Sequence, residues 1–421
     1  MALVRGLKPH RHPRWLRILG PGLITGAADD DPSGIATYSQ AGAAYGYGQL
    51  WTITLCLPLM IAVQEATARI GAVTGKGLAR VTSEHFSKRV LYAVVGLVVF
   101  ANVINIGADI AAVGESLHLL IDVPTVLLSA SFTIFLLILM IFTNYHTYAR
   151  ILKVFAFFLL AYVITALIVD EPWREILRAT FIPHFQWTFE YWYVIVGILG
   201  TTISPYMFFW QAAEEVEERQ YSEKQHVASR TLSDIRVDTS TGMLISQLGS
   251  WFMMLTTATV LHPNGVTNIG SAADAAKALE PFAGHFAQAV FAVGVAGMGL
   301  LGIPVLAGSA SYAVSELFNW NEGLDNKPND AKGFYGVIIA STVVGFALTI
   351  IGLDPIKTLI FAAVVNGLVA VPLVLLIRTI SGNESIMGVF VSKGLSKVVL
   401  AITFIVMLLC AVAMIVALLI H

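Results

Sequence analysis

Three consecutive aspartates, Asp29 to Asp31, interrupt an apolar stretch that runs from residue 18 to residue 55. Carboxylates are costly inside a lipid bilayer, so this part of the backbone must face protein or water. Pro32 lacks an amide hydrogen and disfavours helix in the residues before it, and Gly34 loosens the chain further. We therefore predict a membrane helix that is broken at mid-depth, where free carbonyls and an acidic side chain can bind a cation.

A second break of the same kind is predicted around Pro205, within Thr202 to Tyr206, five hydrophobic segments later. Paired broken helices in corresponding positions of two halves indicate the binding site of a secondary transporter. The two breaks together therefore predict both the fold and the place of the site.

The composition is that of an integral membrane protein. Of the 421 residues, 57% are hydrophobic and 12% are charged, against about 25% charged residues in soluble domains. The net charge of −2 gives no basic surface for nucleic acid. Cys56 and Cys410 lie in apolar spans and indicate neither a disulfide framework nor a metal motif. We expect no cofactor, no nucleic-acid partner, the lipid bilayer as surroundings, and a monomer.

We predict eleven membrane spans, most of them longer than the ~20 residues that cross a bilayer. The spans are 18–44 (broken), 49–70, 90–119, 123–143, 147–169, 190–216 (broken), 237–260, 284–316, 334–353, 356–378 and 397–420. Each break opens a group of five spans, and because five is odd the second group is inverted relative to the first. This predicts an all-α integral membrane protein with the LeuT-type inverted five-plus-five repeat plus one extra helix.

The domain organisation follows from the spans. We expect an N-terminal tail at 1–17 and a single transmembrane transporter domain at 18–420. Within that domain we expect repeat one at about 18–169, repeat two at about 190–378, and the extra helix at 397–420.

Orientation follows from the distribution of basic residues. With the N-terminus in the cytoplasm, the predicted inner segments hold all but four of the 25 Lys and Arg residues, and the exceptions are Arg174, Arg178, Lys277 and Lys357. The positive-inside rule therefore predicts a cytoplasmic N-terminus. Short loops are typical of a prokaryotic protein, so we expect a multi-pass protein of the inner (cell) membrane.

The first break carries a family resemblance. Asp31-Pro32-Ser33-Gly34, followed by Gln40-Ala41-Gly42-Ala43, resembles the first span of the Nramp divalent-metal transporters, which reads Asp-Pro-Gly-Asn and then Gln-Ala-Gly-Ala. Span count and break positions agree over nearly the whole chain. The resemblance implies a divalent-cation transporter with Asp31 as a metal ligand and with Gly34 at the position of the motif asparagine.

The sixth span departs from the family pattern, which reads Ala-x-x-Met-Pro-His-Asn. The matching stretch here is Thr201 to Met207, with Ser204 in the place of the metal-binding Met and Tyr206 in the place of the His. This is similar to the Nramp-related magnesium transporter branch, which lacks the Met and retains the Asp. That branch is understood to accept a largely hydrated ion without proton coupling.

Two further departures concern protons. Asp109 in the third span matches the first residue of the family's Asp-Leu-Ala-Glu, but Ala112 replaces the Glu. The ninth span has no Arg, where proton-coupled members carry a charged network. We therefore expect transport of Mg²⁺ or Mn²⁺ by alternating access without strong proton coupling, and a proton-coupled Mn²⁺/Fe²⁺ symporter is the alternative.

The residues themselves suggest roles at the breaks. Asp31 is a hard anionic ligand or, alternatively, a helix-capping or gating charge. Asp29 and Asp30 are not expected to face the same ion, because successive residues at a break point in different directions. Thr201 and Ser204 lie one turn apart before Pro205, so they either hold an ion or its water or back-bond to their own helix.

Each of the other polar side chains has two possible roles. Tyr206 either lines the site or is a packed aromatic with a satisfied hydroxyl. Asn366, in the tenth span, either reaches the site or makes an interhelical hydrogen bond, and Asn102 and Asn105 have the same ambiguity. Asp109 is a candidate proton acceptor, and Gln211 and Glu214 form either a solvated exit face or part of an inner gate.

The ligand inventory favours hard ions. None of the ten histidines lies in either broken span, which leaves carboxylate, hydroxyl, carbonyl and water oxygens. Such donors suit Mg²⁺, Mn²⁺ and Ca²⁺. Mg²⁺ usually keeps several waters, which fits one strong anion surrounded by neutral oxygens.

Two other function classes are open. A sodium-coupled transporter of an organic solute has the same fold, but three acids at the break would repel an anionic substrate. A polytopic prenyltransferase would use aspartates to hold Mg²⁺-diphosphate, but an Asp-Asp-x-x-Asp spacing requires an acid at Ser33 or Gly34, and neither is acidic. The sequence predicts a transporter and not an enzyme.

Overall fold

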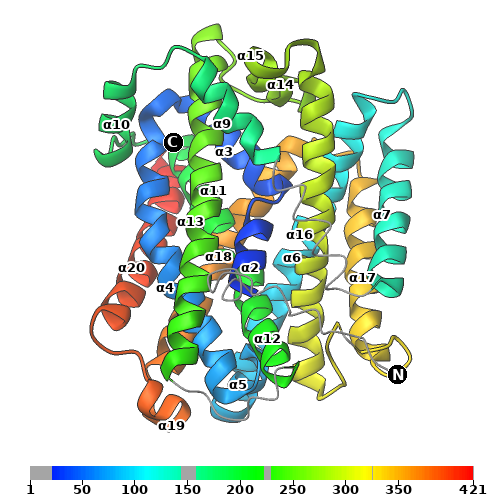
Figure 1. Ribbon diagram of the computed structural model, residues 1–421, viewed down its shortest axis with the longest axis vertical. Coiled ribbons are helices and arrows are strands. Elements are labelled where there is room, and N and C mark those ends of the chain that lie inside the picture. The colour runs from blue at the N-terminus through cyan, green and yellow to red at the C-terminus, as the bar shows by residue number, and fades with distance from the viewer. Residues whose placement is uncertain (1–20, 144–157, 222–228, 325, 421) are drawn as a thin grey trace, which may run out of the picture.

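The computed structural model describes residues 21–143, 158–221, 229–324 and 326–420, and every regular element within those ranges is a helix (Figure 1). The predicted tail at 1–17 lies outside the described residues, as does the first part of the fifth predicted span. The all-α prediction is confirmed for the part of the chain that the structure describes.

The first span is broken where the sequence predicts it. Helix α2 (Pro21–Asp29) ends directly before Asp30, and α3 (Pro32–Tyr45) begins at the proline. Asp31 is the N-cap of α3, because its carboxylate accepts a hydrogen bond from the amide of Gly34. Proline at the first helical position costs no hydrogen bond, so the same residue that ends one helix starts the next.

The sixth span is broken in the same way. Helix α11 (Phe189–Thr202) ends before Ile203, and α12 (Pro205–Tyr221) begins at Pro205. The two broken helices lie near the middle of the bundle in Figure 1, with α2 and α12 in its lower half and α3 above α2.

The remaining elements follow the predicted order of spans. The long helices are α4 (Leu50–Thr74), α6 (Lys88–His118), α7 (Thr125–Phe142), α13 (Ser229–Val260), α16 (Ala287–Phe318), α17 (Lys332–Thr349), α18 (Pro355–Ser381) and α20 (Gly394–Ile420). The short ones are α5 (Leu78–His85), α9 (Leu159–Ile168), α10 (Trp173–Phe181), α14 (Ala272–Ala276), α15 (Glu280–Ala283) and α19 (Glu384–Met387). Five short 3₁₀ turns within the described ranges, η1 and η3 to η6, connect these helices only locally, as at η1 (Gly46–Gln49) between α3 and α4.

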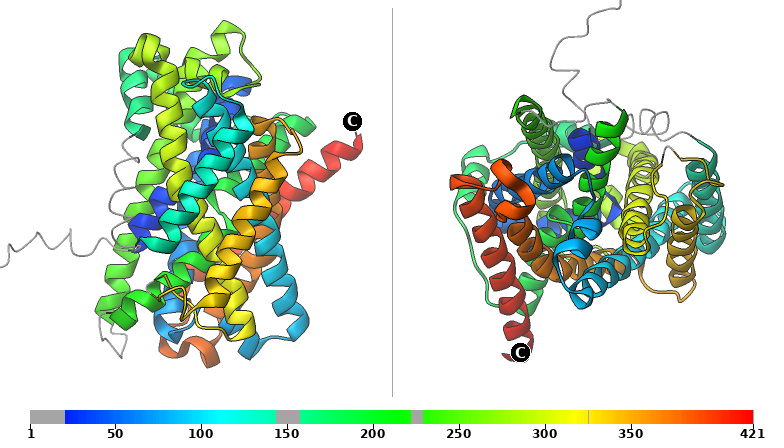
Figure 2. Two further views of the ribbon diagram at one scale, coloured as in Figure 1. Left: turned by 90° about the vertical axis from the view of Figure 1, so that its right-hand side faces the viewer. Right: turned by 90° about the horizontal axis from the view of Figure 1, so that it is seen from below.

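Nine helical stretches among the described residues are long and apolar enough to cross a membrane. One of them, Pro32–Thr74, contains both α3 and α4, and the shorter apolar helix α9 belongs to the fifth predicted span. Helix α20 lies at the edge of the bundle and leans away from it (Figure 2), in agreement with its prediction as an extra helix.

Glycines set the positions of both broken helices. A Cβ atom on Gly26 of α2 would run into the backbone of Gly242 on α13, and one on Gly200 of α11 would run into the carbonyl of Ala363 on α18. Helices approach this closely only where side chains are absent. In addition, the amide of Gly22 donates to Asp238 Oδ2 of α13 at 2.7 Å, which fixes the first turn of α2.

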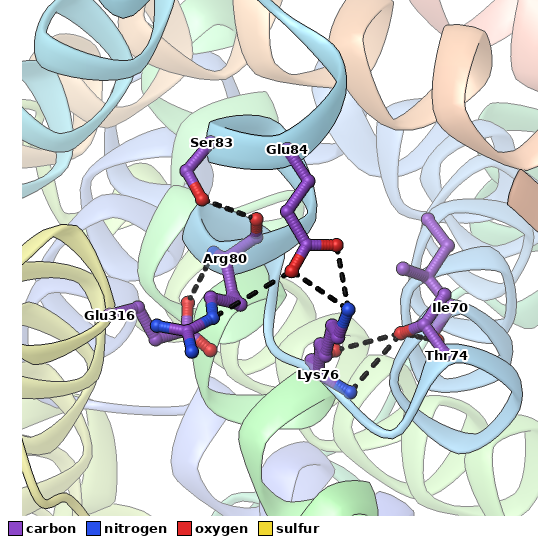
Figure 3. Close-up of polar contacts among 7 residues, drawn as sticks. All are labelled: Ile70, Thr74, Lys76, Arg80, Ser83, Glu84 and Glu316. Atoms are coloured by element: carbon purple, nitrogen blue, oxygen red, sulfur yellow. Dashed lines mark hydrogen bonds and ion pairs between the residues drawn. The ribbon is translucent and has the colours of Figure 1, made fainter. Parts of the chain in front are cut away.

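Polar contacts fasten α5 to α16 at the end of the bundle opposite α14 (Figures 1 and 3). Oε2 of Glu316 lies 2.9 Å from the amide nitrogen of Ala79 and 3.1 Å from that of Arg80, in the first turn of α5. A carboxylate is stabilised at a helix N-terminus by the free amides and the helix dipole. Lys76 also donates to both carboxylate oxygens of Glu84 at 2.7 Å. We call the Glu316–α5 contact the α5 latch.

Candidate cation site

Asp31 lies at the centre of the polar contacts around the first break. Its Oδ1 accepts hydrogen bonds from Ser33 Oγ at 2.6 Å and from the Gly34 amide at 3.0 Å. Its Oδ2 accepts from Asn105 Nδ2 at 3.1 Å and from the Tyr206 hydroxyl at 3.3 Å. The side chain is fully buried. The donors to this single carboxylate therefore come from three elements, α3, α6 and α12.

A fourth helix, α16, packs against the backbone at Asp31. A Cβ atom on Gly302 would lie 2.8 Å from Cβ of Asp31, closer than atoms of neighbouring side chains approach. Gly302 therefore lets α16 pass directly against the break. A larger residue at this position would push the carboxylate away from Asn105 and Tyr206.

Tyr206 joins the two breaks. Its hydroxyl lies 3.3 Å from Asp31 Oδ2 and 3.2 Å from the carbonyl oxygen of Ala28, near the C-terminal end of α2. Because the hydroxyl has one proton and two acceptors, either bond can be made in turn. The side chain is also fully buried, so both sequence-based descriptions of Tyr206, packed aromatic and site residue, fit its position.

Thr201 and Ser204 differ in where their hydroxyls point. A Cβ atom on Gly34 would lie 3.2 Å from Thr201 Oγ1, so this hydroxyl faces the first break. Thr201 Oγ1 is buried and makes no hydrogen bond with the described residues. Ser204 Oγ instead lies 2.7 Å from the carbonyl oxygens of Gly200 and Thr201 in its own helix. The back-bonding alternative thus describes Ser204, and Thr201 is the one turned toward Gly34.

Asn366 lies on α18 beside the end of α11. Its neighbour Gly367 packs against Gly200, the residue before Thr201. Both polar atoms of the Asn366 amide are buried and have no hydrogen-bond partner among the described residues. The amide is therefore free to bind a ligand, although no contact joins it to Asp31.

Asp109 and Gln211 lie on two different helices, α6 and α12. Asp109 is one turn beyond Asn105 on α6, fully buried, and its carboxylate oxygens have no hydrogen-bond partner among the described residues. Gln211 accepts a 2.6 Å bond from Thr25 of α2 and donates at 3.0 Å to Glu215. Gln211 and Glu214 are both buried, so the expectation of a solvated face on α12 is wrong. The fold covers that face with α2, α4 and α16, which leaves the gate alternative.

Asp29 and Asp30 face a different helix from Asp31. Ser246 of α13 donates to Asp29 Oδ2 at 2.6 Å, and Ser250, one turn later, donates to Asp30 Oδ1 at 3.0 Å. The separate directions agree with the expectation from the sequence. Among the described residues, no three His, Cys, Asp or Glu side chains gather in a way that could hold a metal ion. The side chains that donate to Asp31, those of Ser33, Asn105 and Tyr206, are all neutral.

The sequence leaves the contact of Asn105 undecided, and the structure shows that it is Asp31. Asn102 and Asn105 are three residues apart on α6, and both are fully buried. Asn102 donates to the backbone carbonyl of Leu306 on α16 at 2.9 Å, whereas Asn105 donates to Asp31. Only the rotation of α6 about its axis distinguishes them, and that rotation is set by packing. No local sequence signal could have separated the two.

A cavity of about 480 Å³ lies at the far end of α3 from Asp31. Its lining includes Gln40, Glu190 and Lys357. Gln40 also accepts from the Ile269 amide at 2.9 Å and donates to the Thr267 carbonyl at 3.1 Å, so it ties the loop before α14 to α3.

Comparison with known proteins shows which family this chain resembles. The chain matches the Nramp family model, natural resistance-associated macrophage protein-like, over residues 22–417. It is 29% identical over 310 residues to the divalent metal cation transporter MntH of Ralstonia nicotianae, across 71% of this chain and 67% of that protein. It is 27% identical over 412 residues to MntH of Chromohalobacter salexigens, across 92% of this chain and 88% of that protein.

A solved structure supports the fold. A mutant of the Eremococcus coleocola manganese transporter matches with a TM-score of 0.75 at 17% identity, over 96% of this chain and 87% of that one. This likeness, with the two broken helices, confirms the predicted LeuT-type fold of a multi-pass membrane protein. The chain therefore belongs to the Nramp family, whose relatives named here are metal-ion transporters and not enzymes.

Proposed function

We propose that this chain is a secondary transporter that carries a divalent cation by alternating access, with Asp31 as its anionic ligand. The observation that carries the proposal is a single fully buried carboxylate at a helix break, contacted from the second break by Tyr206. A buried charge in a membrane is costly unless it has a partner. A transported cation is that partner.

The relatives support the cargo class. The Ralstonia and Chromohalobacter proteins are named divalent metal cation transporters, and the Eremococcus structure is that of a manganese transporter. Ser33 and Tyr206 bring hydroxyl oxygens to Asp31, and Thr201 and the Ala28 carbonyl add oxygens beside Gly34 and Tyr206, all of them hard donors. We infer that Mg²⁺ and Mn²⁺ are the preferred ions, because hard divalent cations select such ligands.

The half-helices move as a pair in this proposal. Thr25 of α2 binds Gln211 of α12, and the Tyr206 hydroxyl of α12 reaches the Ala28 carbonyl of α2. Opening toward the α5 end then requires both half-helices to leave α16 and the α5 latch to open. With the N-terminus in the cytoplasm, as the basic residues predict, this is the cytoplasmic side of an inner membrane.

Proton coupling has a specific candidate. Asp109 is buried one turn from Asn105, without a hydrogen-bond partner among the described residues, and it is the acid best placed to accept a proton near the cation site. The proton-coupled Mn²⁺/Fe²⁺ symporter is therefore the second candidate function. Ala112 and the absence of arginine from α17 favour uncoupled transport.

The test is ion uptake into proteoliposomes with Mg²⁺ and Mn²⁺ side by side and a pH dye inside. Uptake of both ions with no pH change supports the uncoupled carrier, whereas Mn²⁺ uptake with acidification and no Mg²⁺ uptake supports the symporter. Asp31→Ala is expected to abolish uptake while the protein still elutes as a single folded species. Retained uptake in that variant would exclude Asp31 as the ligand.

A further inference from the structure

We propose that Asn105 of α6 supplies an amide-oxygen ligand to the cation held by Asp31. The inference rests on the proposed function, since it assigns a second ligand to the same site. It assigns to the cation site a residue of the third span for which the sequence leaves open either that site or an interhelical hydrogen bond.

The Asn105 amide lies within hydrogen-bond distance of the Asp31 carboxylate. Nδ2 lies 3.1 Å from Asp31 Oδ2, and the side chain is fully buried. The other atom of the same amide, Oδ1, is buried and makes no hydrogen bond with the described residues. A buried amide oxygen without a partner is costly, so Oδ1 is available as a ligand once the amide turns toward a cation beside Asp31.

The amide can exchange its two ends. Nδ2 donates to Asp31 while no cation is bound. A cation repels the N–H hydrogens, and a half-turn about the last side-chain torsion brings Oδ1 to the place of Nδ2. An amide group has a donor end and an acceptor end of nearly equal shape, so this turn needs no extra space. Asn105 thus supports the free carboxylate and then ligates the ion.

Asn102 provides the contrast. It lies three residues earlier on the same helix, is equally buried, and also has an Oδ1 without a partner among the described residues. Its Nδ2, however, donates to the backbone carbonyl of Leu306 on α16 and not to a carboxylate. Asn102 is therefore a helix-to-helix contact, and the two residues form a matched pair for mutagenesis.

If Asn105 is a ligand, the site contains the charged carboxylate of Asp31 and a neutral amide close to it. Amide and carboxylate oxygens suit hard divalent ions, and a thiolate in the place of the amide suits soft ones such as Cd²⁺. A ligand exchange at position 105 should therefore change which metal binds, which a purely structural residue would not do.

The experiment measures Mn²⁺ and Cd²⁺ binding to the purified full-length protein by titration calorimetry. Asn105→Ala is expected to weaken Mn²⁺ binding about tenfold or more, a typical effect of losing a group that supports a metal site. Asn102→Ala is expected to lower the thermal unfolding temperature but to leave the Mn²⁺ affinity within about twofold. Equal Mn²⁺ affinities for Asn105→Ala and the unmodified protein would overturn the proposal.

A second substitution keeps the test valid if Asn105→Ala fails to fold. Asn105→Cys is expected to raise the ratio of Cd²⁺ to Mn²⁺ affinity about tenfold, and Asn102→Cys is expected to leave the ratio unchanged. The same ratio in both cysteine variants would overturn the proposal. Asp31→Ala distinguishes a failure of the Asn105 proposal from a failure of the proposed function. Mn²⁺ binding that survives Asp31→Ala contradicts the proposed function itself.

Discussion

At the scale of single residues, the three aspartates of the first break have different surroundings. Asp31 receives four hydrogen bonds from three helices, whereas Asp29 and Asp30 each receive one from a serine of α13. Asp30 Oδ2 and Asp29 Oδ1 are buried and lack a hydrogen-bond partner among the described residues. The ion pairs formed among those residues include neither acid. Their burial therefore destabilises the fold, whereas the burial of Asp31 is offset by its four hydrogen bonds.

This difference gives the first prediction. Asp30→Asn keeps the size of the side chain and an oxygen that can accept the Ser250 hydroxyl, and it removes a carboxyl that has no cationic partner. We expect a higher thermal unfolding temperature and Mn²⁺ binding within about twofold of the unmodified protein, because a buried carboxyl without a cationic partner costs more than a buried amide. The measurement is a melting curve with calorimetry on the same sample. Loss of binding as deep as that of Asp31→Ala would place Asp30 in the cation site.

At the scale of elements, α2 depends on α13 more than on its own length. A helix of nine residues is marginal in isolation, since isolated helices shorter than about 12 residues are not stable in water. It is held by the Gly22–Asp238 bond, by the backbone contact of Gly26 with Gly242, and by the bond of Thr25 to Gln211. These contacts place the C-terminal carbonyls of α2 beside Tyr206.

A substitution at Gly26 tests this dependence. A Cβ atom there would meet the backbone of Gly242, which cannot move aside as a flexible side chain can. We expect Gly26→Ala to displace α2, to abolish uptake, and to lower stability by about 1–3 kcal/mol, the usual cost of overpacking. Gly96→Ala on α6 is the control, because a Cβ atom at Gly96 has open space around it. Normal uptake by Gly26→Ala would mean that α2 does not need this contact.

The elements also show how far the sequence can be read. Both breaks were predictable because a proline acts on the residues beside it, and the polar surroundings of Asp31 were predictable because a membrane acid needs a partner. The hydrogen-bond partners of Ser204 and Asn105 were not, because they depend on how far α11 and α6 are rotated about their axes. Ser246 and Ser250 lie more than two hundred residues from the acids they bind, and no local pattern connects them.

At the scale of the whole molecule, alternating access requires one end of the bundle to open. The α5 latch closes the end near α12, where Glu316 accepts the amides of Ala79 and Arg80. A Cβ atom on Gly77 would overlap the Glu316 carboxylate, so the latch also depends on a glycine before α5.

The latch gives the third prediction. Glu316→Gln removes the negative charge that the α5 amides bind, and it should favour the state that is open at this end. We expect faster hydrogen exchange in α5, by about tenfold, because hydrogen bonds between a charged acceptor and an amide contribute about 1.5–3 kcal/mol. Exchange in α10, at the other end of the molecule, is the internal control. Unchanged exchange in α5 would show that the latch does not hold the closed state.

Glu322, in the loop between α16 and α17, makes the stability of this end depend on pH. Burial raises the pKa of Glu322 from 4.5 to about 9, and the neighbouring Glu316 carboxylate acts in the same direction. The folded state then binds a proton more tightly than the unfolded state. Stability that is fully present below pH 4.5 is therefore lost as the pH rises toward 9.

Glu322→Gln has no proton to lose, so its unfolding temperature should fall less between pH 5 and pH 9 than that of the unmodified protein. The gap between the two should widen as the pH rises, since the unmodified carboxyl must ionise in a buried place. Glu384→Gln, an exposed acid elsewhere on the molecule, should follow the unmodified curve. Parallel curves for Glu322→Gln and the unmodified protein would mean that Glu322 ionises as freely in the folded chain as in the unfolded one. The loop would then exert no control over the α5 end through pH.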